Sequence, residues 1–285
     1  MNTVTAKIDQ IQYWNETAGP KWVRYQATLD AQIGPLGLAA MERLAVGSGE
    51  RVLDVGCGCG ATTLELAGRV GPSGSVLGVD VSAPMVEVAR RRLAAAGFAH
   101  ARVELGDATT QRFEPGERDA LFSRFGVMFF PDPTAAFRNL RGALRSDGRL
   151  GFVCWQPVDR NPWTYLALKT ASQYVTLPPR PGPEDPGPFS FADAERVRRI
   201  LGGAGFVDVV LEPHEQELVI AAGASYEDAI DFLVQLGPMT AALKDASEAD
   251  RERVTVAVRE ALAPHVSGGE LRLGSATWLV RARAA

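Results

Sequence analysis

Residues 51–60 read RVLDVGCGCG, and this stretch decides the fold class. The first five residues form a short apolar run that predicts a buried β-strand, and three glycines at alternate positions follow directly. Glycine leaves the backbone bare and permits positive φ, so a ligand can approach the main chain closely. A helix beginning near residue 61 would direct its free N–H groups to the same place, where they suit a carboxylate or a phosphate.

Short apolar runs and helical patterns alternate along the middle of the chain. Strands are expected at 51–55, 75–80, 101–105, 119–123, 149–155, 207–220 and 276–284. Helices are expected near 61–70, 83–96 and 134–146, with Gly97 and Gly148 as C-caps of the last two. This alternation predicts an α/β fold, a doubly wound and mostly parallel sheet with helices on both faces, in which ligands bind beyond the carboxyl ends of the strands.

Three segments lie outside the expected α/β core. Residues 1–44 are rich in Trp and Tyr and are interpreted as a helical cover, with residues 45–285 as the main domain. Residues 156–188 include a Pro-rich loop that excludes regular helix or strand, and residues 222–268 favour helix with a break at Gly237–Pro238. Both insertions are interpreted as lids over a substrate.

Composition and charge exclude several classes of function. The formal net charge of −4 argues against a nucleic-acid partner. The three cysteines cannot all pair within one chain, which argues against a disulfide framework, and Cys57 and Cys59 lack the further ligands that a metal site needs. The N-terminus does not resemble a signal peptide, and no apolar stretch is long enough to cross a bilayer. We therefore expect a cytoplasmic protein with no membrane partner and no bound metal.

An acidic residue stands at the end of each of three successive strands. Asp54 adjoins the glycines, whose third member comes one residue earlier than in the dinucleotide pattern G-x-G-x-x-G; its carboxylate would repel a pyrophosphate but pair with an ammonium group. Asp80 can accept both hydroxyls of a ribose, and Asp107 can accept the exocyclic amine of adenine. Each could instead cap a turn or a helix, but their joint placement favours a site for a nucleoside that bears an amino acid.

The motifs VLDVGCGCG, GVDVSAPM and GDATT, with the stretch from Asp119 to Trp155, resemble those of class I S-adenosylmethionine-dependent methyltransferases. The similarity is to the group of small-molecule and quinone-biosynthesis methyltransferases, and it covers residues 45–155 and, more weakly, 203–212. It implies a Rossmann-like sheet of seven strands whose last strand is antiparallel, and S-adenosylmethionine as the cofactor. The residues that the resemblance assigns to the cofactor are Asp54, Gly56, Cys57 and Gly58 at the methionine end, Asp80 at the ribose, Val81, Met85, Asp107 and Ala108 around the adenine, Ser123, Arg124 and Phe125 at the sulfonium, and Tyr13, Trp14 and Trp22 as an aromatic cover.

Methyl transfer from a sulfonium is an in-line displacement of an activated leaving group, so the chemistry requires chiefly positioning and exclusion of water. A general base would help the reaction if the acceptor is a hydroxyl. Among the histidines, His214 is the preferred candidate for this base, and the alternative is that it is a surface residue. Arg124 could pair with a carboxylate of the cofactor or acceptor, or form a structural salt bridge. Apolar side chains that could form an acceptor pocket, or belong to the core, are Trp155, Trp163, Phe189 and Phe191.

The expected activity is transfer of a methyl group to a small apolar or aromatic metabolite. A second hypothesis is methylation of RNA or protein, but the acidic balance opposes RNA, and SRFG follows the fourth strand in place of an N-P-P-Y type of motif. A third hypothesis, an NAD-dependent oxidoreductase, is disfavoured by the spacing of the glycines. A fourth, a non-catalytic cofactor-binding module, is disfavoured by the lid segments. The sequence leaves open the acceptor, the methylated atom and the oligomeric state.

Overall fold

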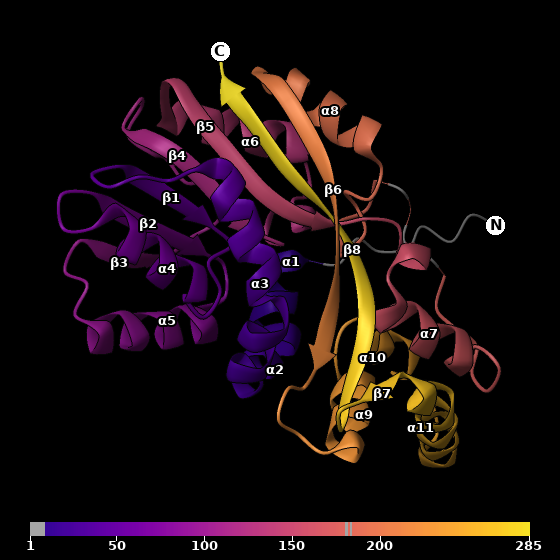
Figure 1. Ribbon diagram of the computed structural model, residues 1–285. Coiled ribbons are helices and arrows are strands. Elements are labelled where there is room, and N and C mark those ends of the chain that lie inside the picture. The colour runs from indigo at the N-terminus through magenta and orange to yellow at the C-terminus, as the bar shows by residue number, and fades with distance from the viewer. Residues whose placement is uncertain (1–8, 180–181, 183) are drawn as a thin grey trace.

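A single twisted sheet forms the centre of the computed structural model, which describes residues 9–179, 182 and 184–285 (Figure 1). Within these residues eight strands pair in the order β3-β2-β1-β4-β5-β8-β6, with β7 beside β8. The strands are β1 Arg51–Val55, β2 Ser75–Asp80, β3 Ala101–Leu105, β4 Arg118–Arg124, β5 Leu144–Trp155, β6 Phe206–Ile220, β7 Val266–Ser267 and β8 Glu270–Ala284. β8 runs antiparallel to both β5 and β6, and the pairs among β1 to β5 are parallel. The predicted doubly wound sheet with an antiparallel last strand is confirmed, and the two-residue β7 is an addition.

Helices cover both faces of the sheet. Leu44 of α3 (Gln26–Leu44) packs against Gly151 of β5, where an added Cβ would lie 3.0 Å from the Leu44 Cβ. The neighbouring Phe152 instead meets Phe137 of α6 (Pro133–Ala143), with ring centroids 5.8 Å apart. Since successive side chains of a strand point to opposite faces, α3 and α6 lie on opposite sides of the sheet. The other covering helices are α4 Ala61–Val70 and α5 Ala83–Ala96 in the layer of α3, and α8 Ala194–Gly203 beside α6.

The junction between α6 and β5 differs from the expectation. Gly97 does cap α5 in the left-handed conformation, but Gly148 is no helix cap, because α6 ends at Ala143 and β5 already begins at Leu144. Leu144 pairs with Arg118 of β4, and the pairing resumes at Arg149, so residues 145–148 bulge from the ladder. At Gly148 a Cβ would lie only 2.9 Å from the carbonyl oxygen of Arg145, so this bulge, and no helix end, explains the glycine.

The segments outside the α/β core are largely helical. Residues 10–44 form α1 Gln10–Gln12, the π-helix η1 Tyr13–Thr17, α2 Ala18–Arg24 and α3, while residues 1–8 of the expected cover lie outside the described residues. The segment 156–188 contains the 3-10 helix η3 Val158–Arg160 and α7 Pro162–Ala171, and its described residues from 176 onward form neither helix nor strand. The segment 222–268 contains α9 Tyr226–Gln235, α10 Pro238–Ala242, α11 Glu248–Leu262 and the 3-10 helix η4 Ala263–His265, and Gly237 marks the predicted break.

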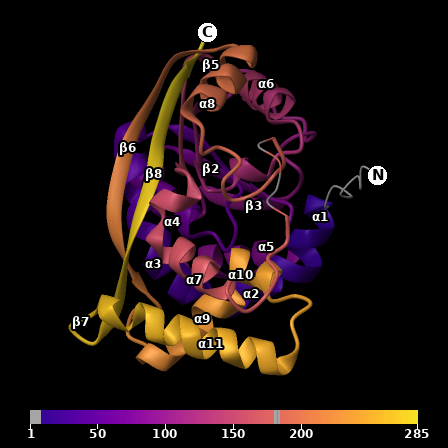
Figure 2. The ribbon, with the colours of Figure 1, turned by 90° about the vertical axis from the view of Figure 1, so that its right-hand side faces the viewer.

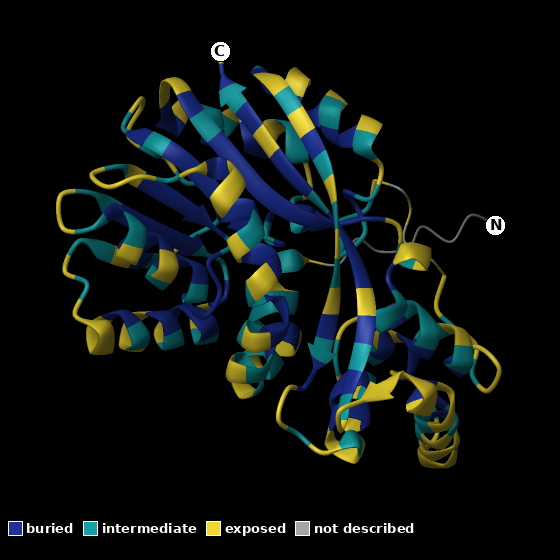
Figure 3. Cartoon of the chain, in the orientation of Figure 1, coloured by how far each residue is buried: buried dark blue, intermediate teal, exposed yellow. Residues whose placement is uncertain are grey.

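β6 and β8 are the longest strands and run past the ends of the others as a two-stranded ribbon. α7, α9, α10 and α11 gather at the far end of this ribbon in both views (Figures 1 and 2). Strands β1, β2 and β4 are largely buried, whereas β3 at the edge of the sheet, the outer sides of the helices and the loops have exposed residues (Figure 3). Among the described residues, every helix falls short of the length or the apolarity that a bilayer span requires.

Candidate functional site

The Gly-rich loop after β1 needs glycine at each of its three glycine positions. Gly56, Gly58 and Gly60 have φ values of 68°, 55° and 82°, in the left-handed region that other residues avoid. A Cβ on Gly56 would lie 2.8 Å from the Cα of Gly126 in the loop after β4, and one on Gly60 would lie 2.9 Å from the Cβ of Ala89 in α5. The glycines therefore bring the loops after β1 and β4 and the helix α5 into close contact.

Asp54 lies fully buried in β1, beneath this loop. Its Oδ2 accepts hydrogen bonds from the hydroxyls of Thr62 and Thr63, each at 2.6 Å, which ties the first turn of α4 to the strand. Its Oδ1 is buried and has no partner among the described residues. Burial raises the pKa of the carboxyl to about 6. A buried acceptor without a donor costs free energy, so Oδ1 fits a ligand ammonium group, directly or through water.

Asp80 ends β2 and also contacts the Gly-rich loop. Its Oδ2 accepts from the backbone N–H of Gly58 at 2.8 Å, and its Oδ1 accepts from the N–H of Ser82 at 2.9 Å. Burial raises the pKa of this carboxyl, and the backbone hydrogen bonds oppose the rise. Each carboxylate oxygen keeps a second lone pair, so Asp80 can still accept from two neighbouring hydroxyls. Met85 is buried in the first turn of α5, with its Cε 2.9 Å from where a Gly58 Cβ would lie.

Asp107 closes a turn after β3. Its Oδ1 accepts from the N–H of Thr109 at 2.8 Å and its Oδ2 from the Thr109 hydroxyl at 2.7 Å, so the capping alternative is realised here. Ala108 is buried in the core, and its carbonyl oxygen accepts from Asn139 of α6 at 3.0 Å. These contacts hold the turn beside the carboxyl end of β2, where lone pairs of Asp107 remain free to accept.

Arg124 takes part in an ion network that the sequence does not reveal. Its Nη2 lies 3.0 Å from Oδ1 of Asp30 in α3, and its side chain is only 11% exposed. Arg92 of α5 lies 3.0 Å from Oδ2 of the same Asp30 and donates to the carbonyl oxygen of Cys59 at 2.7 Å. The structural salt bridge considered for Arg124 is therefore present, and it links α3, α5, β4 and the Gly-rich loop.

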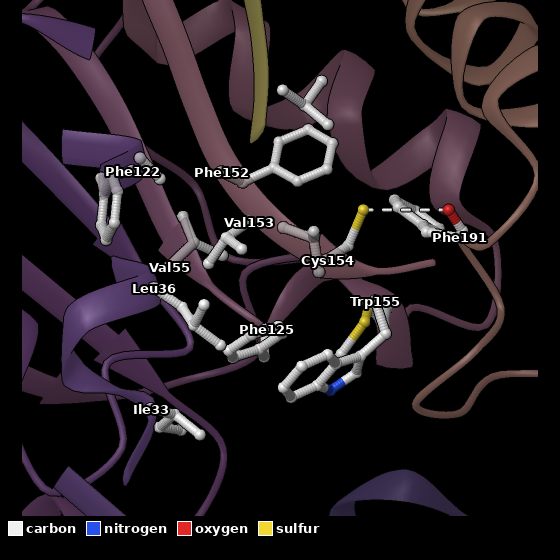
Figure 4. Packing of buried hydrophobic residues seen from close by; sticks show 14 of the residues in the cluster. Ile33, Leu36, Val55, Phe122, Phe125, Phe152, Val153, Cys154, Trp155 and Phe191 are labelled. Carbon is white, nitrogen blue, oxygen red and sulfur yellow. Dashed lines mark hydrogen bonds between the residues drawn. The ribbon is translucent and has the colours of Figure 1, made fainter. Parts of the chain in front are cut away.

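Aromatic rings gather at the carboxyl ends of β4 and β5 (Figure 4). Phe125 has φ 61° and stacks on Trp155, whose ring centroid lies 4.3 Å away. Trp155 in turn meets Trp163 of α7 at 5.0 Å, and the Trp163 Nε1 donates to Oδ1 of Asn161. Ser123, buried at the end of β4, accepts from the N–H of Gly126 at 3.2 Å and supports the turn into this cluster.

Phe191 does not join these rings, so the expected grouping of four aromatic residues is wrong in this respect. It packs on Phe152 and Phe137 at centroid distances of 6.0 and 6.2 Å, on the α6 side of the sheet. Trp155 points to the α3 side, because it lies an odd number of residues from Phe152 in the strand. Phe189 is half-buried and packs against the main hydrophobic core.

The aromatic N-terminal residues contact the loops around β1. The ring of Trp14 meets Trp22 edge to face at 5.9 Å and Phe129, after β4, at 5.0 Å. Its carbonyl oxygen accepts from the Ser82 hydroxyl at 2.8 Å. The next residue, Asn15, bonds the backbone on both sides of Ser82, and sequence reasoning missed it because its partners lie more than sixty residues away.

His214 lies far from the Gly-rich loop, whereas Cys57 and Cys59 are part of that loop. His214 is in β6, the edge strand four positions from β1 in the sheet, and its Nε2 lies 3.3 Å from Oε1 of Gln216. Cys57 and Cys59 are free and buried, and burial raises the pKa of Cys59 to about 12. In the part of the chain that the structure describes, no cluster of three or more His, Cys, Asp or Glu side chains suits a metal ion.

Comparison with known proteins shows which family the chain is similar to. The profile of a family described as a methyltransferase domain matches residues 52–148. The chain is 31% identical over 199 residues to nocamycin O-methyltransferase of Saccharothrix syringae, covering 67% of this chain and 71% of that protein. It is 29% identical over 186 residues to demethylmenaquinone methyltransferase of Staphylococcus saprophyticus, covering 59% of this chain and 75% of the other.

Solved structures share the fold. The YcgJ protein of Bacillus subtilis has a TM-score of 0.56 at 19% identity, over 88% of this chain and 98% of that one. Phosphoethanolamine N-methyltransferase 2 of Haemonchus contortus, in complex with S-adenosyl-L-methionine, has a TM-score of 0.58 at 17% identity, over 98% of this chain and 60% of that one. At these identities the likeness shows the arrangement of strands and helices alone.

Proposed function

We propose that this chain, which belongs to the class I S-adenosylmethionine-dependent methyltransferases, transfers the methyl group of that donor to a small apolar or aromatic metabolite. The observation that carries the proposal is the buried carboxylate of Asp54, which lies beneath three left-handed glycines and has one oxygen without a hydrogen-bond partner in the described part of the chain. S-adenosylmethionine supplies an activated methyl group when bound. The task of the protein's own residues is therefore to bind, orient and exclude water.

Binding of the donor is assigned to the loops after β1 to β4. Asp54 and the glycine backbone would hold the methionine end, and Asp80 would accept the two ribose hydroxyls through its free lone pairs. Val81, Met85, Asp107 and Ala108 would surround the adenine. Ser123 and Phe125 would lie at the sulfonium, while Arg124 holds its place through Asp30.

The acceptor is assigned to the aromatic rings that end β4 and β5. Phe125 and Trp155 stack on each other and are only 6% and 5% exposed, next to the loop assigned to the donor. Aromatic rings favour apolar, planar partners and stabilise a nearby cation, so we infer that the edges of this pair border the acceptor. The similarity to nocamycin O-methyltransferase and to demethylmenaquinone methyltransferase supports a small acceptor. Helices α7, α9, α10 and α11 would form the lid, and residues 10–25 the cover of the donor.

Calorimetry with S-adenosylmethionine tests the cofactor assignment. The wild type should bind, and Asp80→Ala should weaken binding at least about tenfold, because it removes acceptors for two hydroxyls. Asp231→Ala, which truncates an exposed carboxylate on α9, is the matched control and should bind like the wild type. Absence of binding by the wild type, or equal affinity for Asp80→Ala, would overturn the assignment. Transfer of a labelled methyl group to a panel of planar phenols and quinols then tests the acceptor class.

A further inference from the structure

The segment Tyr13–Tyr25, here called the strap, crosses the Gly-rich loop. At one end the Trp14 carbonyl accepts from Ser82 after β2, and the Trp14 ring meets Phe129 after β4. β2 and β4 flank β1 on either side, so a segment that touches both loops passes over the loop between them. α2 also packs along α5, beside which it lies in Figure 2.

Asn15 clamps the strap to the loop after β2. Its Nδ2 donates to the carbonyl oxygen of Val81 at 2.9 Å, and its Oδ1 accepts from the N–H of Ala83 at 2.9 Å. One side-chain amide thus replaces the two hydrogen bonds that a neighbouring strand would offer. The residue between these two is Ser82, which is fully buried and whose own N–H donates to Asp80.

The docking of the strap leaves little freedom. A Cβ on Gly19 would lie 2.1 Å from the Trp14 carbonyl oxygen and 2.4 Å from the Ser82 hydroxyl, so the strap packs on the loop without a gap. Tyr13–Thr17 is a π-helix, a rare geometry that occurs frequently at functional sites. Here it aims the Trp14 carbonyl and the Asn15 side chain at the same loop.

We propose that Asn15 is a positioning residue for the carboxylate of Asp80. By holding Val81 and Ala83, it sets the direction of the Ser82 N–H, and this N–H fixes one oxygen of Asp80 while Gly58 fixes the other. When the strap docks on the loop after β2, it therefore also orients the Asp80 carboxylate for the ribose. This inference rests on the proposed function, because it needs Asp80 to bind the ribose.

The test compares two ligands that differ only at the ribose, S-adenosylhomocysteine and its 2′,3′-dideoxy analogue, by calorimetry. We expect Asn15→Ala to weaken S-adenosylhomocysteine about tenfold and the dideoxy analogue less than about threefold, since the analogue has no hydroxyls for Asp80 to bind. Gln12→Ala, which alters an exposed residue bonded to Glu16 just before the strap, is the matched control and should leave both affinities unchanged.

An equal loss for both ligands would overturn the inference, because it would mean that Asn15 only holds the cover in place. Unchanged affinities would overturn it as well. Asn15→Asp, which keeps the size of the side chain but loses the donor to Val81, provides a second variant if Asn15→Ala unfolds, and it should show the same selective loss. Failure of the wild type to bind S-adenosylhomocysteine would instead refute the cofactor assignment itself.

Discussion

The ring of Phe125 stacks on that of Trp155 with their planes inclined by only 13°. Phe125 holds a left-handed backbone, a conformation that costs a bulky residue about 1 kcal/mol or more. The turn after β4 therefore retains strain while it presents this ring to Trp155 at the end of the next strand. Strain of this kind is common at functional sites, and it supports the assignment of the acceptor to this pair.

Replacing Trp155 with leucine should impair the acceptor and spare the donor. We expect the acceptor kcat/KM to fall at least about tenfold, because a planar partner loses its stacking surface, while the Kd for S-adenosylhomocysteine changes less than about threefold. Tyr174→Leu, at an exposed aromatic residue, is the control and should leave both values unchanged. Steady-state kinetics with calorimetry decide the matter, and an unaltered acceptor kcat/KM would remove Trp155 from the acceptor site.

Alanine should have different effects at two helical glycines, lowering ligand affinity at Gly19 and raising stability at Gly34. Gly19→Ala inserts a methyl group into the Trp14 carbonyl and the Ser82 hydroxyl, so the strap must shift and the affinity for S-adenosylhomocysteine should fall about tenfold or more. At Gly34 in α3, a Cβ would meet no described atom within 4 Å beyond its chain neighbours and the adjacent backbone of its own helix, so Gly34→Ala should raise the free energy of unfolding by up to about 1 kcal/mol through helix propensity. Thermal melts and calorimetry separate the two effects. Equal affinities for Gly19→Ala and the wild type would show that the strap does not cover the donor.

Features that depend on residues close together in the sequence could be predicted. Features that depend on strand pairing or on contacts between distant segments could not. β1, the Gly-rich loop and α4 occupy the expected residues because apolar runs and glycines act locally. Gly148 looks like a helix cap until Leu144 is seen to pair with Arg118. The side of the sheet that Phe191 faces depends on how residues 184–191 pack beneath α8, and no local pattern encodes it. Among the site residues, Asp54 and Asp80 are found by position, whereas Asn15 has only the nearby aromatic residues as a signal.

The stability of the fold should depend on pH through Asp54. Its pKa is about 6 in the folded chain against an ordinary 3.8, so the folded state favours the protonated carboxyl. This contribution is complete below the ordinary value and is lost as the pH rises through about 6. The side chain in Asp54→Asn is neutral at every pH, so it has no ionised form to destabilise. The free energy of unfolding of this variant should therefore increase, relative to that of the wild type, by about 3 kcal/mol between about pH 4 and about pH 7.

Urea unfolding at several pH values measures this difference for Asp54. Asp231→Asn, at an exposed carboxylate, should instead follow the wild type throughout. Parallel curves for Asp54→Asn and the wild type would mean that burial does not raise the pKa of this carboxyl. The same titration bears on binding, since an ammonium group beside Asp54 favours its ionised form and should make the donor bind more tightly as the pH rises towards about 6.

Asp30 should matter more to stability than other surface carboxylates, because it pairs with two arginines at once. Arg124 and Arg92 both lie 3.0 Å from its oxygens, and Arg124 is only 11% exposed, so Asp30→Asn would leave a largely buried guanidinium without its counter-ion. We expect a loss of about 2 kcal/mol in the free energy of unfolding, less than for a fully buried pair because Asp30 retains some solvent contact. The exposed pair of Glu87 and Arg91 offers the comparison, and Glu87→Gln should cost about 0.5 kcal/mol or less. Similar midpoints for the two variants in urea would show that the Asp30 network is as weak as an ordinary surface pair.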